Sequence, residues 1–104
     1  MSYSFSNNSF GNPDILEANF KQAAEDVKYL NKKPTNDDLL FLYGLFKQAS
    51  FGDINIGCPL INLKERAKWT AWNNNKGLDQ NKAKNMYIEF VERLKEKYDY
   101  TKLF

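Results

Sequence analysis

Apolar and polar residues follow a helical period along most of this 104-residue chain. In the first such stretch, apolar residues recur three and four positions apart from Leu16 to Leu30, a spacing that places them on one face of an α-helix. Asn12 and Pro13 favour the start of this helix, because Asn is a common N-cap and Pro suits the first helical position. Pro34 ends it, since a proline disfavours helical conformation in the residue before it.

A second helix is predicted to begin after Thr35, as its N-cap, and to reach Phe51, with Gly52 as a left-handed C-cap. Residues 39–46 of this helix are apolar on almost every side, which indicates a central position in the fold. Residues 52–62 then contain Gly, Pro, Asp and Asn without a helical period. They predict an ordered loop that is long for a compact domain.

Two more helices complete the pattern. The third is predicted from about Leu63 to Asn75, with Gly77 as its terminator. The fourth is capped by Asp79 and is amphipathic as far as Tyr98. The chain shows neither a strand pattern nor an internal repeat, so four helices with mostly short connections favour an all-α bundle.

The pattern divides the chain into three segments. Residues 1–11 are rich in Ser and Asn and predict a flexible N-terminal extension, residues 12–99 form one domain, and residues 100–104 form a short C-terminal tail. The alternative for the extension is that one of its aromatic side chains folds back onto the domain. The sequence shows neither a secretory signal nor an apolar run of bilayer length, which favours a cytoplasmic protein.

The amino-acid composition excludes several kinds of catalytic and metal-binding site. The chain has no histidine and a single cysteine, Cys58, which excludes a Ser-His or Cys-His nucleophile, an intrachain disulfide and the usual zinc sites. Fifteen basic and thirteen acidic residues give a net charge of +2, too little to indicate a nucleic-acid binder. The carboxylates lie beside lysines at helical spacing, as on a solvated face. We therefore expect no enzyme activity, no metal and no cofactor.

Cations and aromatic residues recur together at helical spacing. Tyr43 and Lys47 are four residues apart in the second predicted helix, Lys64 and Lys68 are four apart in the third, and Tyr87 lies in the fourth. Taken singly, each lysine fits a solvated charge and each tyrosine fits half-buried packing. If they converge, they suit a multiply phosphorylated small ligand that carries an aromatic ring.

The two tryptophans are three residues apart in the third predicted helix. Such a pair is typical of core packing for at least one member, because a tryptophan buries a large apolar area. We assign Trp69, together with Phe90, to the core.

Several blocks of this sequence resemble the acyl-CoA-binding protein family. The most specific are Tyr43–Ala49 followed by Gly52–Asn55, and then Ala67–Gly77; Phe20–Val27 and Ala83–Ile88 also match. The resemblance implies a four-helix up-down-down-up bundle that binds one fatty acyl-CoA. It further implies a monomeric intracellular carrier and pool former for medium- and long-chain acyl-CoA in lipid metabolism, without catalytic activity or stable membrane insertion.

The resemblance also implies roles for individual residues. The acyl-CoA ligand would contact Lys28, Tyr43, Gly44, Leu45, Phe46, Lys47, Lys64, Lys68 and Tyr87. Among these, Lys47 and Lys68 would hold the ribose 3′-phosphate, and Tyr43 and Tyr87 would lie against the CoA head group. The acyl chain would lie in a groove lined by Phe20, Ala24, Leu39 and Leu40.

This chain departs from the family pattern near the start of the third predicted helix. Leu60 and Glu65 replace glycines, and the segment from Pro59 to Trp69 is one residue shorter than the common form. The acidic Glu65 could weaken ligand binding or could pair with a neighbouring lysine, and the effect of the shorter loop stays open.

Two other classes of function compete with the carrier. A helical nucleic-acid binder is disfavoured because no predicted helix carries a continuous basic stripe. A protein-interaction module that keeps the fold without the ligand is disfavoured by the retained Tyr43, Lys47, Lys68 and Tyr87.

Overall fold

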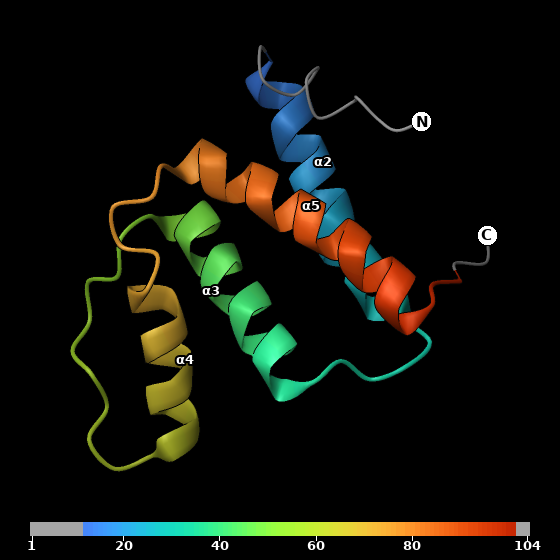
Figure 1. Ribbon diagram of the computed structural model, residues 1–104. Helices are drawn as coiled ribbons and strands as arrows, with labels where there is room; N and C mark the ends of the chain where they lie inside the picture. The colour runs from blue at the N-terminus through green and yellow to red at the C-terminus, as the bar shows by residue number, and fades with distance from the viewer. Residues whose placement is uncertain (1–11, 102–104) are drawn as a thin grey trace.

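The computed structural model describes residues 12–101. Its helices are α2 (Pro13–Asp26), the 3₁₀-helix η1 (Val27–Tyr29), α3 (Asn36–Phe51), α4 (Leu63–Asn73) and α5 (Gln80–Tyr98). Within the described residues there is no β-strand, only an isolated bridge between Leu30 and Tyr100. The predicted all-α fold is confirmed. α2 and α5 run in one direction and α3 and α4 in the other, which is the up-down-down-up order (Figure 1).

The predicted N-caps lie where the helices begin. The Asn12 side chain accepts hydrogen bonds from the backbone N–H groups of Asp14 and Ile15, at 2.9 and 3.2 Å. Thr35 and Asp79 each accept from the backbone N–H three residues later. These bonds satisfy donors that the first turn of a helix leaves without an intrahelical partner.

The first α-helix ends earlier than the pattern predicts. It stops at Asp26, continues as η1, and leaves Leu30 extended with φ −66° and ψ 134°. The backbone N–H groups of Asn31 and Lys32 then donate to carbonyls at the end of α5, at 2.8 and 3.0 Å. These long-range bonds replace the helical bonds that a longer α2 would make, so tertiary pairing overrides the periodic pattern.

The third predicted helix also ends early, at Asn73 rather than Asn75, and a turn follows. Gly77 lies in this turn at φ +91°, a conformation that favours glycine. The Asp53 carboxylate accepts from the Gly77 N–H at 2.8 Å and from the buried Gln48 amide at 2.9 Å. Asp53 therefore fixes the start of the 52–62 loop to the turn between α4 and α5.

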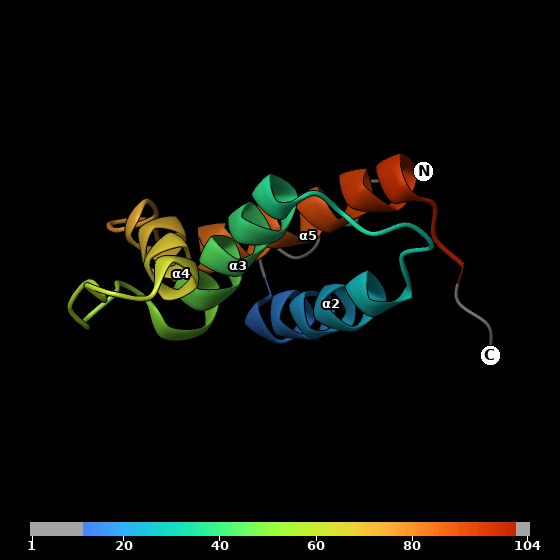
Figure 2. The same ribbon diagram turned by 90° about the horizontal axis from the view of Figure 1, so that it is seen from below.

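The hydrophobic core lies between α2, α3 and α5. Its largest fully buried apolar side chains are Leu45, Leu94 and Val91. α4 packs against α3 at one edge of the molecule, and Figure 2 shows the resulting flat shape, with extents of 44, 33 and 19 Å. None of the described helices is long and apolar enough to cross a lipid bilayer.

The C-terminal segment lies partly against the domain. Tyr100 carries the bridge to Leu30, and the Lys95 ammonium lies 4.5 Å from the centre of its ring. The Asn31 amide donates to the Thr101 hydroxyl at 3.0 Å. The start of the predicted tail is thus bonded to the bundle, whereas the predicted flexible extension, residues 1–11, lies outside the described residues.

Candidate functional site

Two lysines and three aromatic rings meet where the second half of α3 lies beside α4. The Lys47 Nζ is 5.9 Å from the ring centre of Tyr43, 4.6 Å from that of Phe51 and 5.0 Å from that of Trp72. The Lys68 Nζ lies 5.7 Å from the same Tyr43 ring. We call these five residues the lysine–aromatic cluster. Ring faces attract cations through their quadrupoles, so the cluster holds two ammonium groups in place.

Lys47 is half-buried in the cluster. Within the described residues its ammonium forms no ion pair with a carboxylate, and its neighbours are the three rings. An ammonium on ring faces keeps most of its hydrogen-bonding capacity, since a ring takes up no N–H donor fully. Lys47 can therefore donate to an anionic ligand without first breaking an ion pair.

Lys68 has a weak competing partner. The Glu65 carboxylate lies 3.7 Å from its ammonium, and both side chains are about half exposed to solvent. An exposed pair at this distance stabilises the fold little. The acidic residue that replaces a family glycine therefore pairs with Lys68, one of the two outcomes that the sequence leaves open.

A second aromatic group adjoins the cluster along α3. The Phe46 ring lies 5.6 Å from Phe20 on α2 and 5.9 Å from Tyr87 on α5, and Phe20 and Tyr87 meet edge to face at 5.2 Å. Phe46 follows Tyr43 by three residues, which places both on neighbouring positions of the α3 surface. The predicted site residues Tyr43, Phe46 and Tyr87 thus lie in one continuous region.

Tyr87 is almost completely buried in this region. It is 3% exposed, and burial raises the pKa of its phenol to about 12. The hydroxyl is therefore neutral at physiological pH and can donate a hydrogen bond.

Gly44 and Leu45, which the resemblance includes among the ligand contacts, serve packing in this structure. Leu45 has no exposed surface and lies in the core. A Cβ on Gly44 would lie 2.3 Å from the Ala71 carbonyl oxygen. Glycine at this position thus allows α3 and α4 to approach closely. We leave both residues out of the proposed ligand contacts.

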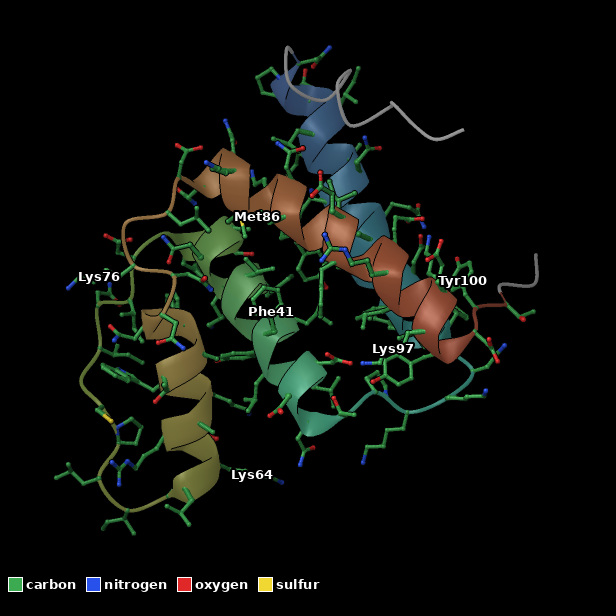
Figure 3. All side chains as sticks on the ribbon, in the orientation of Figure 1. Phe41, Lys64, Lys76, Met86, Lys97 and Tyr100 are labelled. Atoms are coloured by element: carbon green, nitrogen blue, oxygen red, sulfur yellow. The ribbon has the colours of Figure 1, made fainter. Side chains whose placement is uncertain are left out.

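The two remaining predicted lysines lie outside the cluster. Lys28 is in η1 at the end of α2, where its ammonium pairs with Glu25 at 2.8 Å; its hydrogen bond to that carboxylate raises the pKa of Lys28. Lys64 is exposed in the first turn of α4, as Figure 3 shows. Lys64 is one turn before Lys68, whereas the structure shows no contact that ties Lys28 to the cluster.

The four predicted acyl-groove residues are in different environments. Phe20 is buried, and Ala24 is half-buried beside the core. Leu39 is 37% exposed on α3. Leu40 instead faces α4, where it lines an open cavity of about 630 Å³ with Phe41, Ala67 and Thr70. Leu40 therefore lies on the α4 side of α3, whereas Phe20 and Ala24 lie on α2.

Several members of this region are not predicted from the sequence. Phe51 and Trp72 were not predicted as partners of Lys47, although Phe51 follows Lys47 by one helical turn. Lys84 was not predicted either; its ammonium pairs with Glu17 at 2.7 Å and lies 6.0 Å from the Phe20 ring centre. The contacts of Trp72 and Lys84 join residues on different helices, so no local spacing could reveal them.

The assignment of Trp69 to the core is wrong. Trp72 is the buried tryptophan, at 7% exposed, and its indole N–H donates to the Gly52 carbonyl at 2.8 Å. Trp69 is half-buried and donates to the Ile56 carbonyl at 2.7 Å. Both indoles thus fasten the 52–62 loop to α4. Phe90, also assigned to the core, is half-buried and packs against it.

The fold and the cluster together are typical of a helical binding module for a small anionic ligand with an aromatic group. A family model described as "Acyl CoA binding protein" matches residues 17–91. The chain belongs to the acyl-CoA-binding protein family, whose members are binding proteins rather than enzymes.

Solved structures of three similar proteins support this assignment. Acyl-CoA-binding protein 2 from Oryza sativa is 42% identical with a TM-score of 0.75, over 79% of this chain and 92% of that one. The protein from Moniliophthora perniciosa is 36% identical with a TM-score of 0.73, over 80% and 83%. The protein from Babesia bovis is 31% identical with a TM-score of 0.62, over 82% and 94%.

Proposed function

We propose that this protein binds medium- and long-chain fatty acyl-CoA esters and acts as a monomeric cytoplasmic carrier that holds a pool of them for lipid metabolism. It catalyses no reaction on the bound ester. The observation that carries this proposal is the position of Lys47 and Lys68, on two different helices, each within 6 Å of the Tyr43 ring centre.

The cluster suits the head group of the ligand. A phosphate placed between Lys47 and Lys68 would meet two ammonium groups, and charge-assisted hydrogen bonds of this kind are about twice as strong as neutral ones. The Tyr43 hydroxyl can add a further bond, and its ring offers a face for stacking with a base. The ribose 3′-phosphate is the group that we assign to this position.

The apolar surfaces near the cluster suit the acyl chain. Phe20, Ala24 and Leu39 offer apolar contacts on α2 and α3, and Leu40 lines the cavity beside α4. Each buried methylene contributes about 0.8 kcal/mol, which changes affinity by up to about fourfold. The absence of histidine from the whole chain supports a carrier that holds a thioester intact, because the usual activated nucleophiles depend on an imidazole.

Calorimetric titration tests this function. We expect tight binding of palmitoyl-CoA and binding weaker by about tenfold or more for the 3′-dephospho analogue, because two cations lose their shared anion. Equal affinity for the two esters would contradict the phosphate assignment. The absence of heat with either ester would contradict the carrier function and favour a protein-interaction module with the same fold.

A further inference from the structure

Phe51 is a large apolar side chain that lies outside the hydrophobic core. It is the last residue of α3 and is 65% exposed, more than any other aromatic side chain among residues 12–101. Its ring centre lies 4.6 Å from the Lys47 ammonium, the shortest such distance in the lysine–aromatic cluster, and 6.3 Å from the Trp72 ring centre. Phe51 therefore contacts the proposed head-group site, and its loss would remove little from the core.

The contact between Phe51 and Lys47 follows from the geometry of α3. The two residues are four positions apart, so they are neighbours on one face of the helix. A long side chain in an α-helix leans toward the N-terminus, onto the preceding turn. The Phe51 ring thus covers the turn that carries Lys47. The Trp72 indole lies 5.0 Å from the same ammonium and is itself fixed, since it donates to the Gly52 carbonyl at 2.8 Å.

The Lys47 ammonium lies near a second cation. Lys47 and Lys68 each approach the same Tyr43 ring centre to within 6 Å, and like charges this close repel each other when no anion lies between them. Glu65 offsets the charge of Lys68 from 3.7 Å, whereas Lys47 has no carboxylate partner among residues 12–101. A lysine side chain that nothing holds also keeps many rotamers. Without the rings, the Lys47 ammonium would move away from Lys68.

We propose that Phe51 is a positioning residue for Lys47. Its ring keeps the Lys47 ammonium beside Lys68 in the ligand-free protein, so that the 3′-phosphate meets two cations already in place. A site that is ordered before the ligand arrives binds more tightly, because less conformational freedom is lost on binding. This inference rests on the proposed acyl-CoA binding and adds a residue that acts on the phosphate only through Lys47.

Calorimetry with palmitoyl-CoA and its 3′-dephospho analogue measures the effect on binding. Phe51→Leu keeps an apolar side chain but removes the ring, and we expect it to bind palmitoyl-CoA about two- to fivefold more weakly, the factor that corresponds to one cation–π contact. Phe51→Tyr keeps the ring and should bind as the wild type does. All three proteins should bind the dephospho analogue equally, which would also verify that the variants are folded.

Tyr29→Leu is the matched control for the loss of a ring. Tyr29 is an exposed aromatic residue of η1, outside the lysine–aromatic cluster. This variant should bind both esters as the wild type does.

A double-mutant cycle shows whether Phe51 acts through Lys47. In the Lys47→Ala background, Phe51→Leu should cause no further loss of affinity, because no ammonium is left to position. A Phe51 ring that contacted the ligand directly would still cause a loss in this background.

Proton NMR of the ligand-free protein tests the positioning without any acyl-CoA. Ring currents shift the resonances of protons that lie over an aromatic face. In Phe51→Leu, the side-chain methylene resonances of Lys47 should move toward the values of a solvated lysine. They should stay near the wild-type values in Phe51→Tyr and in Tyr29→Leu.

Three results would overturn the positioning role. The first is a Phe51→Leu protein that binds palmitoyl-CoA as tightly as the wild type. The second is a loss that is equally large with the dephospho analogue or that persists in Lys47→Ala, and the third is a set of Lys47 resonances that Phe51→Leu leaves unchanged. The proposed function fails separately: a wild type that binds neither ester would contradict it, even if the Lys47 resonances respond to Phe51→Leu.

Discussion

Replacing Lys47 by alanine gives the sharpest test of the proposed head-group site. The side chain supplies one of two ammonium groups that we assign to the ribose 3′-phosphate, and among the described residues it has no carboxylate partner that would compensate for its loss. A hydrogen bond to a charged group contributes about 1.5–3 kcal/mol. We therefore expect acyl-CoA affinity to fall by about ten- to a hundredfold.

The loss should be independent of the acyl chain. Calorimetric titration with octanoyl-, dodecanoyl- and palmitoyl-CoA should show the same factor for each ester, because Lys47 contacts the common head group. The free energy contributed per methylene should stay unchanged. With the 3′-dephospho ester, Lys47→Ala should bind almost as well as the wild type, since the phosphate partner is already gone.

Stability needs a separate control, because Lys47 also lies over the rings of Phe51 and Trp72 at 4.6 and 5.0 Å. Each cation–π contact contributes about 0.5–1 kcal/mol, so urea unfolding should show a loss of about 1 kcal/mol in Lys47→Ala. Lys33→Ala, at an exposed position outside the site, should change neither property. A loss of affinity that grows with chain length, or that is equally large with the dephospho ester, would refute the assignment of Lys47 to the phosphate.

Three further predictions follow from other contacts. Glu65→Gln should bind acyl-CoA about two- to fourfold more tightly at low salt, because it frees Lys68 from its exposed partner. Salt screens this exposed pair, so calorimetry at high salt should show a smaller difference in affinity between the variant and the wild type. Gly44→Ala should lower the free energy of unfolding in urea by about 1–3 kcal/mol, since its Cβ would overlap the α4 backbone. Burial opposes ionisation of Asp26, but the hydrogen bonds from Lys95 and Gln22 and the charge of Lys95 together outweigh it and lower the pKa of that carboxyl. The stabilisation from Asp26 is thus present above its unfolded pKa of about 3.9 and is lost as the pH falls through the lower folded pKa. Asp26→Asn should therefore have a lower free energy of unfolding than the wild type at pH 7. Unfolding curves in acid should show this difference becoming smaller.

The sequence predicted those parts of the fold that local chemistry determines. The caps at Asn12, Thr35 and Asp79 each use a side chain to satisfy backbone N–H groups two or three residues away, so a short window of sequence contains the whole interaction. The positive φ of Gly52 and Gly77 follows in the same way from the lack of a Cβ. The ends of α2 and α4 depend on long-range bonds. The predicted helix is therefore too long by about one turn for α2 and by about half a turn for α4.

Less of the site than of the fold could be predicted from the sequence, because most contacts in the site join different helices. The pair Tyr43 and Lys47 is visible as an i,i+4 spacing, and the resemblance adds Lys68 from another helix. The approach of Trp72 to Lys47 depends on how α3 and α4 are aligned. The direction of Leu40, toward α4 rather than toward α2, depends on the same alignment. Contacts between helices of this kind need the three-dimensional structure.

The alignment of α3 and α4 therefore links the packing of this fold to its proposed ligand. Gly44 lets the α3 backbone reach the Ala71 carbonyl, and the Trp72 indole fixes the end of α4 to the carbonyl just past α3. A slip of one helical turn would move α4 by about 5.4 Å, comparable to the 5.7 Å that separates the Lys68 ammonium from the Tyr43 ring centre. The two lysines would then no longer share one phosphate. Gly44→Ala should consequently weaken acyl-CoA binding as well as stability, although Gly44 itself offers the ligand no side chain.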